Sequence, residues 1–186
     1  MRFVRLLGPR SFQYVLWRAE SSPAPELGEI AIERVGSGDD LSDPQRAFLR
    51  RRIRALTLWR LMRWPRAGEG WVFLGRWDGE YCHYSFVTAA RRYRKVFPVM
   101  EGGRALLIGP CLTDERFRGR SIFPRVLQHI VSTLSGQGVG PFYIHAAPGN
   151  HASLRAIEKA GFSRLGTWAG TRWLFDARVR SERVGD

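Results

Sequence analysis

The sequence predicts one mixed α/β domain of the α+β type, and two observations lead to this prediction. Short runs in which apolar and polar residues alternate are interleaved with runs at helical spacing, in the order strand, helices, three strands, helix, strand, helix, two strands. The 186 residues are enough for one domain with a sizeable core but too few for two. The sequence shows no internal repeat. We therefore expect residues 1–186 to form a single domain.

The first part of the chain has the weakest patterns. We interpret residues 1–28 as an N-terminal extension, in which Phe12, Tyr14, Leu16 and Trp17 suggest a short strand or turn. Residues 29–35, EIAIERV, alternate at period two and predict the first clear strand.

A basic helical segment is expected next. Ser42 or Asp43 is a suitable N-cap, and Pro44 suits the first helical position. Residues 45–63 interleave apolar and basic side chains, which predicts a basic amphipathic helix or helix pair. We expect one face to pack on a sheet, and a membrane- or partner-binding surface is the alternative.

The middle of the chain shows clearer patterns. Residues 70–90 contain two β-rich runs around Asp78-Gly79, which predict a hairpin. Residues 104–113 are a third strand-like run, and residues 121–135 have helical spacing with Pro124 in the first turn.

The last part of the chain predicts three strands and a helix. A strand is expected within 138–147, followed by a helix over 150–160 with Asn150 as N-cap and Gly161 after its end. The runs 162–170 and 171–179 predict a closing antiparallel hairpin, and we expect residues 179–186 to be a disordered tail.

The composition limits the classes of function. The net charge of +13 favours anionic ligands. Only Lys95 and Lys159 among the 30 basic residues are lysines, so a general preference for arginine explains part of this charge. Nucleic acid is therefore not the partner we expect. Cys82 and Cys111 have no metal-binding spacing, so we expect reduced thiols and no metal. No long apolar run or signal-peptide core occurs, so we expect a cytoplasmic protein without a transmembrane segment.

The stretch DERFRGRSIFP, residues 114–124, lies between a predicted strand and a predicted helix. Amide groups at a helix N-terminus bind anions, Gly119 allows close backbone approach, and Arg118 and Arg120 add positive charge. The stretch is neither a Walker loop nor a G-x-G-x-x-G motif. It indicates a pyrophosphate site, with a plain basic turn as the equally simple alternative.

Two motifs resemble the GCN5-related N-acetyltransferase (GNAT) superfamily. The first is Arg118-Gly119-Arg120-Ser121-Ile122-Phe123, and the second combines Asn150-His151-Ala152-Ser153 with Gly161-Phe162. The longer stretch CLTDERFRGRSIFP is also similar to a bacterial subgroup associated with surface-polysaccharide and sugar pathways. The resemblance covers residues 104–162.

This resemblance implies a mostly antiparallel sheet of six to seven strands with about four helices and a splay between the fourth and fifth strands. It implies that acetyl-CoA, or another acyl-CoA, is the cosubstrate. Pantetheine would pair with the backbone of Cys111, Leu112 and Thr113, and Asn150 and Ser153 would contact it from the other side. The pyrophosphate would lie on the amides of the turn, whose residues are Arg118, Gly119, Arg120, Ser121, Ile122 and Phe123.

Four positions depart from the family pattern. Ser121 stands where the family usually has glycine, Phe123 where the residue is usually small, and Glu115 where proline is usual. The tyrosine that commonly serves as general acid is replaced by Ile157. The resemblance therefore leaves the cofactor affinity and the proton donor open.

Candidate catalytic residues follow from the chemistry of amine acylation, in which the amine loses a proton and the thiolate gains one. His145 is the first choice for the base because it ends a strand at the splay and histidine titrates near ~6.5. His83 and Tyr84 come next, and Tyr143 is a possible source of the proton. Cys111 is expected to be a packed strand residue, because direct attack needs no acyl-enzyme.

The leading hypothesis is an acetyl-CoA-dependent N-acetyltransferase for a small, anionic amine such as a nucleotide-linked amino sugar. The alternatives are a basic module that binds nucleic acid or a membrane surface, and a family member that binds the cofactor without turnover. A peripheral membrane contact, the acyl-chain length and the choice between monomer and homodimer stay open.

Overall fold

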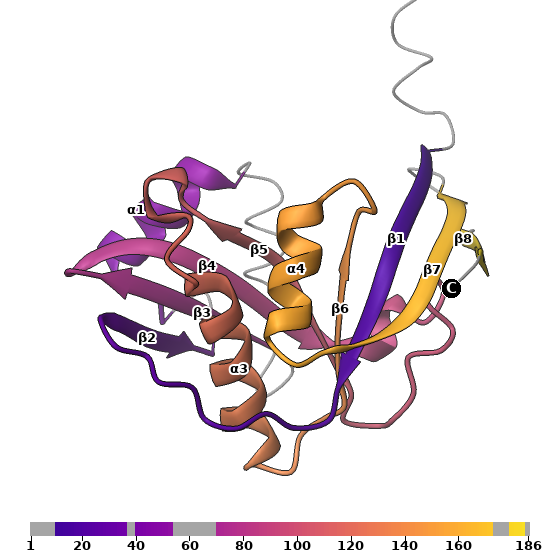
Figure 1. The fold of residues 1–186 in the computed structure, drawn as a ribbon, viewed down its shortest axis with the longest axis horizontal. Coiled ribbons are helices and arrows are strands. Elements are labelled where there is room, and N and C mark those ends of the chain that lie inside the picture. Colours follow the sequence, from indigo (N-terminus) through magenta and orange to yellow (C-terminus); the bar gives the residue numbers. More distant parts are fainter. Residues whose placement is uncertain (1–9, 37–39, 54–69, 173–178, 185–186) are drawn as a thin grey trace, which may run out of the picture.

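The computed structural model describes residues 10–36, 40–53, 70–172 and 179–184, which form one eight-stranded sheet and three α-helices (Figure 1). The sheet order is β2-β3-β4-β5-β6-β1-β7-β8. Among the strands of the described residues, β5 and β6 are the one pair that is parallel. The strands are β1 Arg10–Ala19, β2 Ile30–Val35, β3 Gly70–Trp77, β4 Glu80–Ala89, β5 Leu106–Thr113, β6 Phe142–Ala146, β7 Ser163–Arg172 and β8 Val179–Arg183.

The described helices are α1 Asp43–Arg52, α3 Ile122–Ser135 and α4 His151–Lys159, with short 3-10 turns at Ala90–Tyr93 and Glu115–Phe117. The α+β class with a mostly antiparallel sheet is confirmed, although the sheet has eight strands rather than six to seven and the described residues hold three α-helices rather than four. Over the described ranges, no helix combines the length and apolar character needed to cross a membrane.

The helices cover both faces of the sheet. In Figure 1, α3 and α4 lie in front of it, and their buried residues, such as Val126, Leu127 and Ile157, join the largest core cluster. Helix α1 packs on the opposite face, where Phe48 and Leu49 meet alternate residues of β3 and β4. A third cluster on that opposite face lies over β6, β1 and β7 and includes Tyr143 and Phe97. Burial of apolar side chains on both faces holds the sheet between these layers.

Local sequence signals set several element boundaries. Ser42 is the N-cap of α1, and its amide donates to the side-chain oxygen of Gln45 at 2.9 Å. Asp78 and Gly79 both have positive φ, 48° and 78°, as a two-residue hairpin turn requires, so the β3–β4 hairpin forms as predicted. The strand predictions at 29–35 and 104–113 and the helix predictions at 121–135 and 150–160 are also confirmed to within a few residues.

Two sequence-based expectations need correction. The expected tail at 179–186 contains β8 over Val179–Arg183, which pairs with β7. The break expected between 162–170 and 171–179 is absent, because β7 continues through Thr171. The helix or helix pair expected over 45–63 begins with α1, which ends at Arg52, since Ile53 is extended with φ −122° and ψ 130°. The rest of that expected segment, residues 54–63, lies outside the described residues.

Strand β1 is the largest addition to the predicted fold. It is ten residues long rather than a short strand or turn, and it lies between β6 and β7, pairing antiparallel with both. Sequence patterns did not reveal it because Val15, Leu16 and Trp17 are buried in succession, which removes the period-two signal. Since β1 separates β6 from β7, it connects the β7–β8 pair to the rest of the sheet.

We therefore expect Leu16→Ala to destabilise the protein strongly. Leu16 is fully buried at the centre of β1, and removing such a side chain costs about 2–5 kcal/mol. Urea unfolding measures the effect. Gln13→Ala on the same strand, where the side chain is exposed, should change the free energy of unfolding by less than about 0.5 kcal/mol. Equal effects of the two substitutions would contradict the placement of β1.

Candidate cofactor site

The site begins where β5 and β6 separate. The two strands pair from Leu106 with Phe142 to Ile108 with Ile144, and no further. Beyond that point β5 continues to Thr113 while β6 pairs only with β1. The predicted splay is therefore present, between the fourth and fifth strands of the sheet order.

The separation leaves one edge of β5 open. The amide of Asp114 donates to Cys82 O on β4 at 2.8 Å, so it points toward β4. Because N–H and C=O groups alternate along a strand, those of Cys111 and Thr113 point the other way, into the splay. Two amides and two carbonyls on the β5 edge are thus available to an extended ligand.

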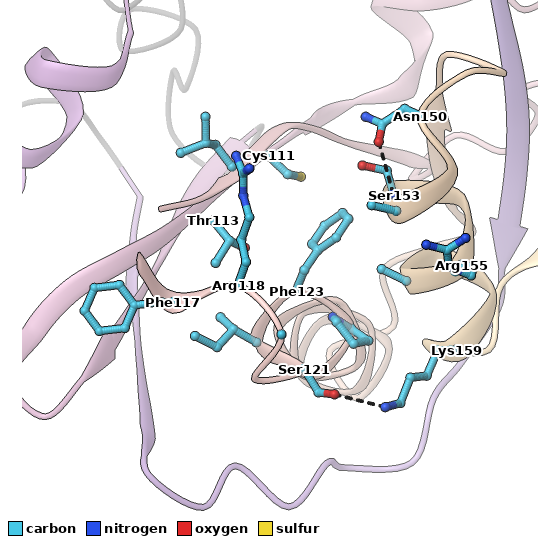
Figure 2. A pocket seen from close by; sticks show the side chains of 16 residues that line it. Cys111, Thr113, Phe117, Arg118, Ser121, Phe123, Asn150, Ser153, Arg155 and Lys159 are labelled. Atoms are coloured by element: carbon cyan, nitrogen blue, oxygen red, sulfur yellow. Dashed lines mark hydrogen bonds between the residues drawn. The ribbon is translucent and has the colours of Figure 1, made fainter. Parts of the chain in front are cut away.

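A cavity of about 660 Å³ lies against this edge, between β5, the turn after it, α3 and α4 (Figure 2). Every residue expected to bind the cofactor lines it except Arg120. The sequence reasoning missed several other lining residues, namely Phe117, Pro124, Ala152, Arg155, Ala156 and Lys159.

The lining residues that belong to α4 lie on one face of this helix. The sequence could have revealed this face, because Ala152, Ala156 and Lys159 are three or four residues apart. Small side chains at 152 and 156 leave room for a ligand, while the exposed Arg155 and Lys159 bring positive charge to it. Asn150 Oδ1 accepts from the amide of Ser153 at 3.2 Å, so this side chain also caps α4 at the cavity wall (Figure 2).

The turn between β5 and α3 has a left-handed backbone at two residues. Gly119 has φ 81° and Ser121 has φ 55°, and Ser121 is the N-cap of α3. A left-handed φ explains why glycine suits position 121, and a residue with a β-carbon occupies it here at a cost of about 1–2 kcal/mol. The Ser121 hydroxyl accepts from Lys159 Nζ at 3.0 Å, which joins α3 to α4 (Figure 2).

The arginines of the turn have different partners. Arg118 lines the cavity and forms an exposed ion pair, at 3.2 Å, with Glu115 at the usual proline position. Arg116 pairs with Glu80 and Asp114. The Arg120 guanidinium lies 4.9 Å from the Trp77 ring centroid, outside the cavity lining. The turn thus directs one guanidinium, that of Arg118, into the cavity.

Asp114 anchors the turn to α1. Its carboxylate accepts from the Arg116 amide at 3.2 Å and forms a half-buried ion pair with Arg52 at the end of α1. Burial alone would raise the pKa of Asp114, but the Arg116 amide and the Arg52 guanidinium outweigh it and hold this pKa below its usual value.

A buried polar chain supports the β5 wall. His83 is fully buried, with Nδ1 2.8 Å from Thr113 Oγ1 and Nε2 2.8 Å from Ser85 Oγ. Its ring lies 5.7 Å from that of Phe123, which lines the cavity. Burial lowers the pKa of His83 to about 3, so the ring is neutral. The neutral His83 ring therefore links Thr113 on β5 to Ser85 on β4 by hydrogen bonds, and it is itself buried behind the cavity.

The other candidate catalytic residues lie on the opposite face. Burial lowers the pKa of His145 to about 4, its Nδ1 is buried without a partner among the described residues, and its ring is 4.5 Å from Tyr14. The Tyr143 hydroxyl accepts from the Glu101 amide at 3.1 Å. Tyr84 packs under α1, where burial raises its pKa to about 12. These three side chains therefore do not share a site with His83. Of the three, His145 is the one next to the splay, because it directly follows Ile144 of the last β5–β6 pair.

No group of three or more potential metal ligands occurs in the described part of the chain. Cys82 and Cys111 are free thiols, and burial raises the pKa of Cys111 to about 12.

Comparisons with known proteins identify the fold. No family model matches the chain, and no curated protein matches it in sequence. Among solved structures, a protein described as a GNAT-family acetyltransferase from Novosphingobium aromaticivorans superposes with a TM-score of 0.59 at 19% identity, over 87% of this chain and 64% of that one. A GNAT-family acetyltransferase from Colwellia psychrerythraea gives 0.57 at 16% identity, over 85% and 54%.

A third similar structure is an aminoglycoside acetyltransferase from an uncultured soil metagenomic sample, in complex with sisomicin. Its TM-score is 0.54 at 13% identity, over 71% of this chain and 87% of that one. The chain spans less than two thirds of the lengths of the first two structures. At these identities the similarity shows that the chain has the GNAT fold.

The backbone of the turn gives a first test of the site. Gly119→Ala should lower the free energy of unfolding by about 1–2 kcal/mol, because φ 81° is strained for alanine although no atom lies within 4 Å of the new methyl group. Gly103→Ala also meets open space but lacks the left-handed φ, so it should not destabilise the protein. Thermal or urea unfolding of both variants distinguishes them, and equal stability would contradict the turn geometry.

The Asp114 anchor predicts a pH dependence. Because its folded pKa is lowered, its stabilisation is present above the ordinary carboxyl pKa near 3.8 and is lost as pH falls through the lower folded value. Asp114→Asn should therefore cost about 1–2 kcal/mol at pH 7, and the difference from wild type should shrink below pH ~4. Urea unfolding against pH measures this, with the largely exposed Glu115→Gln as a near-neutral control. A difference that is constant with pH would refute the ion-pair role.

Proposed function

We propose that the protein is an acyl-CoA-dependent N-acyltransferase that transfers an acetyl group to a primary amine of a small molecule. The single observation that carries the proposal is the open β5 edge at Cys111 and Thr113, which lies in the same cavity as the left-handed turn and its cations. An extended amide-bearing arm joined to a pyrophosphate complements this combination. Acyl-CoA has both parts.

The described residues fit such a ligand. Pantetheine would pair with the outward backbone groups of Cys111 and Thr113 as an added strand. The pyrophosphate would lie at the N-terminus of α3, where the amides after Gly119 are unpaired within the helix and Arg118 is near. Asn150 and Ser153 would face the arm from α4.

The reaction is a direct transfer. The amine nitrogen forms a bond to the thioester carbonyl carbon, the carbon–sulfur bond breaks, one amine proton leaves, and the thiolate takes up a proton. Cys111 is a poor nucleophile because its raised pKa keeps the thiol protonated. Ile157, at the usual acid position, is a buried apolar core residue, so protonation has another source, for which water suffices.

His145 is the residue we assign to the acceptor side. It lies at the splay on the face opposite α3 and α4, and its lowered pKa keeps it neutral near pH 7. In the Nε2-protonated tautomer, Nδ1 is a hydrogen-bond acceptor without a partner among the described residues, and because this atom is buried it can take the proton of the amine only where acceptor binding opens its surroundings.

The acceptor class rests on charge and on one neighbour. Arg94 and Lys95 follow the central hairpin with exposed side chains, which favours an anionic acceptor such as a nucleotide-linked amino sugar. The sisomicin complex of a structure with the same fold supports an amino-sugar-like amine, whereas the anionic character of the acceptor rests on Arg94 and Lys95.

A free-thiol assay with acetyl-CoA and a panel of amino sugars, nucleotide amino sugars, amino acids, polyamines and peptides tests the proposal. We expect thiol release with at least one amine. His145→Gln should lower kcat by at least ~10-fold with the KM for acetyl-CoA unchanged, because general-base catalysis contributes ~10²–10⁴-fold. His129→Gln, on α3 and outside the cavity lining, is the matched control and should keep its rate.

Two outcomes would contradict the proposal at different levels. A missing thermal shift with excess acetyl-CoA would exclude the cofactor site, since a ligand that binds the folded state must raise its stability. A thermal shift without thiol release across the whole panel would leave a cofactor-binding protein that does not catalyse transfer.

A further inference from the structure

The buried polar chain behind the cavity wall has a fourth member. On the paired strands β4 and β5, His83 lies opposite Thr113, and Ser85 lies opposite Cys111. His83 Nδ1 is 2.8 Å from Thr113 Oγ1, and His83 Nε2 is 2.8 Å from Ser85 Oγ. The Ser85 hydroxyl is hydrogen-bonded in turn to the Cys111 thiol. The four side chains therefore form one continuous series of hydrogen bonds.

The two ends of this polar chain reach the cavity, and its two middle members do not. Cys111 and Thr113 line the cavity (Figure 2), and both are partly exposed. His83 and Ser85 are fully buried, and neither lines the cavity. The polar chain thus connects two points of the cavity wall by a path that water does not enter.

Such a polar chain can pass a proton without ever holding a charge. A neutral imidazole has one donor and one acceptor nitrogen, and a hydroxyl group both donates and accepts. Burial keeps the His83 ring neutral by lowering its pKa to about 3. When Thr113 donates to Nδ1, Nε2 donates to Ser85, and the passage of one proton reverses both hydrogen bonds. In the empty cavity, water at both ends allows the reverse transfer, which restores the first arrangement.

The two ends of the polar chain would meet different parts of the bound ligand. The proposed pyrophosphate position is the turn that follows Thr113, so the arm would run back along β5 from Thr113 to Cys111. The thioester would then lie beside Cys111, toward the last β5–β6 pair at Ile108. The buried Ile157 offers the leaving sulfur no proton, whereas Cys111 carries a thiol on the cavity wall.

We propose that this polar chain is a proton relay, in which the Cys111 thiol protonates the leaving CoA thiolate and is itself reprotonated from Thr113. The inference rests on the proposed function, because the sulfur meets Cys111 only if the arm lies along β5. Ser85 passes its proton to Cys111, His83 Nε2 passes one to Ser85, and Thr113 passes one to Nδ1. The solvent, which receives the amine proton, returns one to Thr113. The transfers are concerted, so no Cys111 thiolate forms, which agrees with the raised pKa of this thiol.

Single-turnover acetyl transfer by Ser85→Ala tests the relay at its middle. The acceptor is the amine of the panel above that gives the fastest thiol release. Acetyl-CoA affinity should stay the same, because Ser85 does not line the cavity. The transfer rate should fall at least ~10-fold, because general acid catalysis contributes ~10²–10⁴-fold.

The solvent isotope effect distinguishes a relay from a structural role. Several protons move together in wild type, so its transfer rate should fall along a curve as the fraction of heavy water rises. In Ser85→Ala the relay is broken, and the remaining dependence should be weaker and linear. A substitution that only disturbed the cavity wall would slow transfer without changing this dependence.

Thr88→Val is the matched control. Thr88 is also buried on β4, and its hydroxyl has no partner among the described residues, so it lies outside the relay. Removing this hydroxyl should change neither the transfer rate nor the isotope effect. Cys111→Ala is the second test variant, because it removes the last member of the relay and keeps the β5 backbone. It should reproduce both changes expected for Ser85→Ala.

The outcomes separate the relay from the proposed function. Unchanged transfer rates in Ser85→Ala and Cys111→Ala would overturn the relay while leaving the acyltransferase proposal intact. Slower transfer with the isotope effect of wild type would also overturn it. If Ser85→Ala does not fold, Cys111→Ala decides between these results. No thiol release by wild type with any amine of the panel would overturn the proposed function, and the relay with it.

Discussion

The candidate site depends on the point at which β6 stops pairing with β5. Up to Ile144 the strand has β5 on one side, and beyond it β6 pairs only with β1. The last residues of β5 therefore keep one edge of backbone donors and acceptors without a strand partner. An unpaired polar edge inside a domain is costly unless water or a ligand satisfies it. The cavity, its helical walls and the proposed cofactor binding all follow from that edge.

Electrostatics at the site depend on placement rather than on the net charge of +13. Arg52 and Arg116 neutralise Asp114, and Arg120 stacks on Trp77, so these arginines hold the turn in shape. Arg118, Arg155 and Lys159 line the cavity. Most of the arginines of the turn are therefore engaged by groups of the protein itself, which agrees with the proposed role of the turn in binding one anionic group rather than a polyanion. The buried His83 has the same structural role for β5, since its ring nitrogens meet two hydroxyls.

The sequence predicted the parts whose signals are local. The hairpin at Asp78-Gly79, the cap at Asn150 and the helix of 121–135 depend on neighbouring residues, and the turn residues around Gly119 were found through their motif. The sequence could not reveal β1, because its place between β6 and β7 depends on partners more than a hundred residues away. For the same reason the sequence did not show that Glu26 and Lys159 line the same cavity. Nor did it show that His83 and His145 lie on opposite faces of the sheet.

Amide hydrogen exchange at the β5 edge tests the central claim most directly. Without ligand, the amides of Cys111 and Thr113 should exchange quickly, while that of Asp114 is protected by Cys82 O. Saturating CoA should slow exchange at Cys111 and Thr113 by at least ~10-fold and leave the protection at Asp114 nearly unchanged, because an added strand bonds only the outward groups. Exchange at Cys111 and Thr113 that stays fast with CoA bound would contradict the account.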